Sequence, residues 1–169
     1  MPNGNNNFTV HPKVWKDWKI IAKHHKAKEF QIFLPDDHSG ITDEIKIDST
    51  PQLKAIRNSI TNATASLQLE SIANPYDRQP FLSLGWKVYK MRWGIDNKGK
   101  SSGLRIIFCT NKDNVLLIYI ATKNDCATET KLEKEFLSRI KTYLSWFTLC
   151  DPIENRTLVI WMKTRCPNH

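Results

Sequence analysis

Three β-like segments that follow one another, residues 86–93, 104–109 and 115–121, constrain the fold more than any other part of the chain. In the first, Tyr89, Met91 and Trp93 alternate with Val88, Lys90 and Arg92, which is typical of a strand with one buried face. In the second, Leu104, Ile106 and Phe108 should face inward. The third is apolar throughout, as expected of a central strand that is covered on both faces. The connections between the segments are too short for a parallel crossover, so we expect an antiparallel meander.

The same alternation predicts that basic residues gather on one side of this meander. If Tyr89 and Met91 face the core, Lys90 and Arg92 face the other way, and Arg105 does so on the next segment. Residues 85–105 contain one acidic residue, Asp96, and six basic ones: Lys87, Lys90, Arg92, Lys98, Lys100 and Arg105. A sheet face this basic suits a polyanion such as a nucleic acid.

The composition is that of one soluble globular domain. The chain has 169 residues, of which 40% are apolar and 25% charged, and its formal charge is +8. No apolar run is long enough to span a bilayer, and the first residues lack the features of a signal peptide, so we expect a cytoplasmic protein with no membrane partner. The four cysteines have no CxxC spacing, and we predict neither a metal site nor a cofactor.

Helical periodicity predicts three helices around the meander. The first spans residues 12–25, with Pro12 in its first turn and lysines on its outer side. The second runs from the N-cap Thr50 to about residue 72, with an apolar stripe that recurs at helical spacing. That stripe consists of Leu53, Ile56, Ile60, Ala63 and Leu67. The third helix spans residues 128–146, and its buried stripe includes Phe136 and Ile140.

The remaining segments read as connections. Residues 8–10 suit a short edge strand, residues 29–49 an irregular insertion, and residues 74–80 a loop with two prolines. Residues 146–169 form a C-terminal extension that contains a possible strand at 157–161. The predicted fold is therefore a single α+β domain over residues 1–169, with two N-terminal helices packed on a small antiparallel sheet and a C-terminal helix.

Several motifs of this chain resemble those of a known family. They are Asn74-Pro75, then Tyr89-Lys90-Met91-Arg92-Trp93, then Gly99-Lys100-Ser101-Ser102-Gly103-Leu104-Arg105-Ile106-Ile107, and finally Lys123-Asn124-Asp125. In this order they resemble the RelE/ParE superfamily of bacterial toxins, nearer its RelE and HigB branch. Ser102 stands where the family usually has the first glycine of a pair. The similarity covers roughly residues 74–140, with a looser match over the two N-terminal helices.

The resemblance implies a toxin of a type II toxin–antitoxin system that cuts mRNA on the ribosome without a metal. In this chemistry the 2′-hydroxyl attacks the adjacent phosphate and leaves a 2′,3′-cyclic phosphate, which requires a base, an acid and charge stabilisation. Matching positions imply Lys90 as base, Arg105 as phosphate clamp, and Arg92 and Lys123 as stabilisers or acid. Three further lysines would hold the RNA backbone: Lys87, Lys98 and Lys100. The implied partners are a cognate antitoxin, the ribosome and mRNA.

Two other functions remain open, and a departure from the family favours one of them. Several RelE-like toxins carry a Tyr or His shortly after the last strand, and residues 124–128 supply neither. A non-catalytic relative that only binds nucleic acid is therefore one alternative. A ParE-like inhibitor of DNA gyrase is another, although that branch tends to lack a cluster of the Lys90, Arg92 and Arg105 type.

Overall fold

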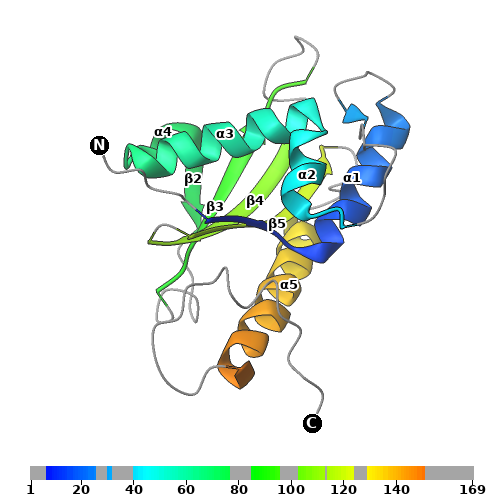
Figure 1. Cartoon of the computed structure of the whole chain (residues 1–169). Helices are drawn as coiled ribbons and strands as arrows, with labels where there is room; N and C mark the ends of the chain where they lie inside the picture. Colours follow the sequence, from blue (N-terminus) through cyan, green and yellow to red (C-terminus); the bar gives the residue numbers. More distant parts are fainter. Residues whose placement is uncertain are drawn as a thin grey trace.

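The computed structural model of the chain describes residues 7–25, 30–31, 40–76, 85–95, 103–112, 114–123 and 129–150. Within these residues, five strands form one sheet whose two faces are covered by helices (Figure 1). The strands are β1 (Asn7–Val10), β2 (Ala73–Tyr76), β3 (Lys87–Trp93), β4 (Leu104–Asn111) and β5 (Asn114–Thr122). The helices are α1 (Pro12–His24), α2 (Asp43–Asp48), α3 (Pro51–Ala65), α4 (Leu69–Ile72) and α5 (Glu129–Cys150).

The predicted meander is confirmed, because β3, β4 and β5 are antiparallel neighbours. The strand order is β1-β5-β4-β3-β2, which places the apolar β5 inside the sheet as expected. The predicted edge strand is β1, but it runs parallel to β5. The prediction of an antiparallel sheet is therefore wrong for this pair, and the sheet is mixed. Most of the chain separates β1 from β5, so no short connection fixes their relative direction.

The prediction of a loop over residues 74–80 is wrong in its first part. Residues 73–76 form β2, which pairs antiparallel with β3 at the edge of the sheet. Pro75 has no N–H group to donate, and an edge strand tolerates this because one side of its backbone has no neighbouring strand. Residues 77–80 lie outside the described part of the chain.

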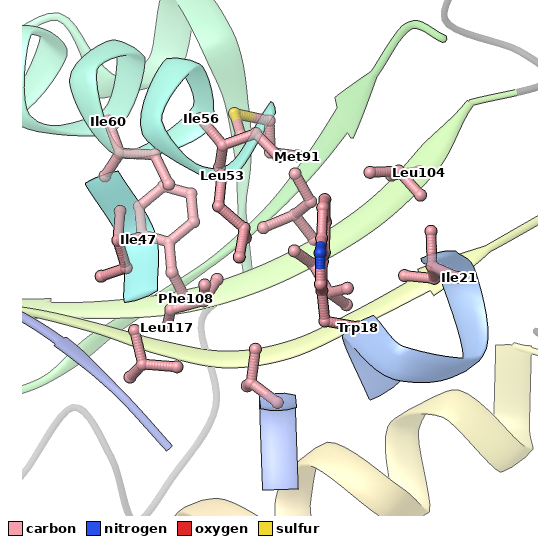
Figure 2. Packing of buried hydrophobic residues seen from close by; sticks show 14 of the residues in the cluster. Trp18, Ile21, Ile47, Leu53, Ile56, Ile60, Met91, Leu104, Phe108 and Leu117 are labelled. Atoms are coloured by element: carbon pink, nitrogen blue, oxygen red, sulfur yellow. The ribbon is translucent and has the colours of Figure 1, made fainter. Parts of the chain in front are cut away.

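The larger hydrophobic cluster lies between the first face of the sheet and α1, α2 and α3 (Figure 2). Trp18 of α1 is fully buried there, stacks on Phe30 at 5.7 Å between ring centroids, and donates its indole N–H to the Phe30 carbonyl at 3.0 Å. Phe30 and Ile47 both come from the segment that we expected to be an irregular insertion. That segment therefore contributes α2 and buried side chains to the main core.

The second predicted helix is shorter than its apolar periodicity indicated. Its stripe from Leu53 to Ala63 is buried as predicted, but α3 ends at Ala65. Leu67 then takes a left-handed backbone (φ 56°), and the N–H of Gln68 bonds to the Ala63 carbonyl at 2.8 Å, as in a Schellman C-cap. Leu67 is 92% exposed, so its assignment to the core was wrong.

The second face of the sheet is covered in part by α5, which Figure 1 shows running from the sheet to the side opposite α3. A smaller cluster is buried here, and it includes Phe136 and Ile140 as predicted. It also contains Trp86, which directly precedes β3, and the strand residues Val88, Ile107, Cys109, Leu116 and Ile118. No helix among the described residues is long and apolar enough to cross a membrane.

Candidate nucleic-acid interface

A row of basic residues lies on the second face of the sheet, beside the part that α5 covers. Lys90 and Arg92 alternate along β3 with Tyr89 and Met91, which belong to the first-face core. Arg105 lies on β4, where it alternates with Leu104 and Ile106 in the same way. The predicted split between an apolar and a basic side is therefore confirmed for these three residues. We call Lys90, Arg92 and Arg105 the basic row.

Arg92 and Arg105 are directly opposite each other in the register of β3 and β4. Like charges at opposed positions of an antiparallel pair destabilise a sheet, and an anion between them removes the repulsion. A guanidinium group also presents paired donors that match the oxygens of a phosphate. The pair therefore has the geometry of a phosphate clamp, with Arg92 exposed and Arg105 half-buried.

Lys90 is surrounded by aromatic rings that the sequence analysis did not connect with it. Its Nζ lies 4.4 Å from the ring centroid of Tyr76 on β2 and 5.9 Å from that of Phe136 on α5. The two rings meet edge to face at 5.2 Å, and the Tyr76 hydroxyl donates a hydrogen bond to Oε1 of Glu133. The face of an aromatic ring attracts a cation, so this setting suits a charged lysine.

The other predicted site residues do not all join the basic row. Lys123 is exposed and comes directly after β5, whose last residue pairs with Leu104 beside Arg105. Lys87 is exposed but alternates with Val88, so it lies on the opposite side of β3 from Lys90. Lys98 and Lys100 lie outside the described residues.

Backbone packing at Gly103 holds the start of β4 against the end of β3. A Cβ atom at Gly103 would lie 1.8 Å from the carbonyl oxygen of Trp93, which no side chain can do without moving the strand. Gly103 directly precedes β4. The glycine therefore fixes the register that brings Arg105 opposite Arg92.

A buried arginine joins α5 to the rest of the molecule at the far side of the second face. Arg139 donates from Nη2 to Oδ1 of Asp17 at 3.0 Å, from Nε to Glu135 at 2.9 Å, and from Nη1 to the Ile118 carbonyl at 3.1 Å. Ile118 is the extra residue of a β-bulge, because the register passes from Ile107 opposite Tyr119 to Phe108 opposite Leu117. The arginine therefore satisfies a carbonyl that the bulge takes out of the ladder.

The electrostatics of this junction are those of a structural site. Burial works against the charge of Arg139, but its hydrogen bonds and charge interactions with Asp17 and Glu135 outweigh burial and raise its pKa. Burial, followed by the positive charges of Arg139 and Lys13, lowers the pKa of His11 to about 4. His11 is then neutral near pH 7, and its Nδ1 accepts the backbone N–H of Lys13 as the N-cap of α1.

The described residues also include a buried cysteine and several side chains of the kinds that bind metals. Burial raises the pKa of the Cys109 thiol, so this cysteine is a core residue with little thiolate character. No group of three His, Cys, Asp or Glu side chains in the described ranges could hold a metal ion.

Comparisons with known protein families, with curated proteins and with solved structures found no match.

Proposed function

We propose that this chain is a metal-independent endoribonuclease, a RelE-like toxin that cuts mRNA on the ribosome and is neutralised by an antitoxin. The observation that carries the proposal is the direct opposition of Arg92 and Arg105, with Lys90 beside them on the same face. Binding of the scissile phosphate there relieves the repulsion between the two arginines. The motifs that resemble the RelE branch support the same assignment.

The proposed cleavage begins with the 2′-hydroxyl next to the bound phosphate. Its proton passes to the Glu133 carboxylate, its oxygen forms a bond to phosphorus, and the bond from phosphorus to the 5′-oxygen breaks. Lys90 gives its proton to the leaving 5′-oxygen, and the product carries a 2′,3′-cyclic phosphate. Arg92, Arg105 and Lys123 stabilise the negative charge of the phosphorane.

This assignment changes the role that the family resemblance implies for Lys90. A base must lose its proton before the reaction, whereas the Tyr76 and Phe136 rings beside Lys90 favour a cation. Lys90 therefore suits the acid, and the nearby carboxylate of Glu133 suits the base. Tyr76 holds that carboxylate in place through its hydroxyl.

A second candidate function, RNA binding without cleavage, is favoured by the position of α5. Phe136 packs against Tyr76 beside Lys90, and Glu133 places negative charge next to a phosphate-binding surface. If α5 stays in this place on RNA, the carboxylate only anchors the helix. The two functions share the basic row and differ in whether Glu133 exchanges a proton.

Primer extension on a translated mRNA tests the proposal in cells that express the wild type or Arg105→Ala. We expect cuts at defined codon positions with the wild type and a loss of roughly 100-fold or more with the variant, because a fixed charge donor to the reacting phosphate is removed. Arg57→Ala is a matched control, since Arg57 lies on α3 and pairs with Asp48 at 2.8 Å. It should cut like the wild type.

Glu133→Gln separates the two candidate functions. The glutamine oxygen can still accept the Tyr76 hydrogen bond, but the amide cannot take up a proton. A loss of cleavage with unchanged RNA affinity supports the nuclease. Intact mRNA in cells that express the wild type rejects it, and growth arrest under those conditions would then indicate another target such as gyrase.

A further inference from the structure

Four exposed lysines follow the outer side of α1, on the helix that packs against the first face of the sheet. They recur every three or four residues and occupy roughly a third of the helix circumference. Their side lies opposite the buried side formed by Val14, Trp18 and Ile21. We call Lys13, Lys16, Lys19 and Lys23 the lysine stripe.

The carboxylate of Asp17 on α1 does not neutralise the positive charge of the stripe, because it is bound elsewhere. Asp17 is the one acidic residue of α1, and its carboxylate is bound by the buried Arg139. Lys13 lies 4.0 Å from Glu135. Within the described part of the chain, Lys16, Lys19 and Lys23 form no ion pair.

The stripe is also held rigidly. Trp18 fixes α1 to the core, and the bond between Asp17 and Arg139 fixes it to α5. From Lys13 to Lys23 the helix rises by about 15 Å, so the four charges form a row along a surface that need not reorganise. The phosphate groups of a nucleic-acid duplex also form a regular row of charges.

We propose that the lysine stripe is a second RNA-binding surface, which holds the backbone of a duplex RNA segment while the basic row holds the strand to be cut. The choice of RNA rests on the proposed function, because the ribosome offers duplex RNA around the mRNA. The two surfaces are on opposite sides of the sheet: α1 packs on the first face and the basic row lies on the second. They therefore bind different segments.

The residue types argue against the other partners of a basic helix. Protein interfaces are depleted in lysine and enriched in aromatic residues and arginine, and this stripe has four lysines around one exposed apolar residue, Ile20. A helix that lies in a membrane surface buries its apolar face in lipid, whereas the apolar face of α1 is already in the protein core. Phosphate groups need neither an aromatic-rich surface nor a free apolar face, so they match the stripe.

Binding to a 20-base-pair RNA duplex, followed by fluorescence anisotropy over a range of salt concentrations, tests the proposal. The stripe variant changes Lys13, Lys16, Lys19 and Lys23 to Gln. We expect roughly 100-fold weaker binding at 0.1 M salt, and a slope of log affinity against log salt that is smaller by about three. The control variant changes Lys54, Lys112, Lys134 and Lys141 to Gln, which removes the same charge from other exposed positions. Its affinity should fall less than fivefold.

Three results would overturn the inference. Equal losses in both variants would mean that only net charge matters. Tighter binding of the wild type to a DNA duplex than to the RNA duplex would reject RNA, and binding to phosphatidylserine vesicles but not to RNA would indicate a membrane surface. A wild type whose lysine stripe binds duplex RNA but which cuts no mRNA would leave this inference standing while the proposed function fails.

Discussion

The two faces of the sheet differ in what they bury and in what they leave charged. The first face is covered by α1, α2 and α3 over one continuous apolar cluster. The second face is divided, because α5 covers a smaller apolar cluster and the basic row lies beside it. Most of the apolar burial that stabilises the fold therefore lies on the first face, which leaves the second free to carry like charges at a cost in stability.

The largest expected effect on stability comes from Arg139, whose hydrogen bonds join α5 to Asp17 and to the Ile118 carbonyl. Arg139→Met leaves the carboxylate of Asp17 largely buried without its counter-charge, and it also removes the donor to the Ile118 carbonyl. We expect the free energy of unfolding to fall by about 4 kcal/mol, measured by urea denaturation. The double variant with Asp17→Leu should recover most of this loss. A single variant as stable as the wild type would show that the junction is not what holds α5.

Neighbouring residues of β4 test the division between the faces directly. Ile106 is fully buried in the first-face cluster, one residue after Arg105. Ile106→Ala should lower the free energy of unfolding by about 3 kcal/mol, because it leaves a cavity in the core. The folded variant should still bind RNA with wild-type affinity. Lost affinity in folded protein would mean that the basic row depends on the packing behind it.

A fall in pH should lower the free energy of unfolding through the protonation of His11. Its pKa is about 4 in the folded protein and about 6.5 when unfolded, so the unfolded state takes up a proton first as the pH falls. The stability that neutral His11 contributes is complete above pH 6.5 and is lost toward pH 4, by at most roughly 3 kcal/mol. His11→Asn keeps an N-cap acceptor and should flatten urea-unfolding stability over this range. An unchanged slope in this variant would assign the pH dependence to other groups.

Sequence periodicity predicted the elements that depend on local patterns and on one buried side. It gave α1, the stripe of α3 up to Ala63, the three strands of the meander, and the side on which Lys90, Arg92 and Arg105 lie. It failed where local conformation opposed the pattern. Leu67 continues the apolar spacing of α3, but the chain has already turned there, and Pro75 indicates a loop although it lies in an edge strand.

Contacts between distant segments could not be predicted from the sequence. Tyr76 and Glu133 are 57 residues apart, and their hydrogen bond depends on β2 being a strand and on α5 crossing the second face. Arg139 and Asp17 are 122 residues apart. A single sequence shows the arginine only as one more charge on a helix, whereas in the fold it is buried against Asp17 and the Ile118 carbonyl.

The smallest expected effect concerns the cost of the basic row itself. Arg92→Thr removes one of two opposed charges and introduces a residue that favours strands, so the free energy of unfolding should rise by about 0.5 kcal/mol at low salt. In 1 M salt the gain should shrink, because screening already weakens the repulsion. Lys87→Thr is the matched control, since Lys87 is on the same strand but opposite Thr110. A gain of equal size in both variants would mean that strand propensity alone explains the effect. A gain confined to Arg92→Thr, accompanied by weaker RNA binding, would mean that the opposed arginines lower stability but raise the affinity for phosphate.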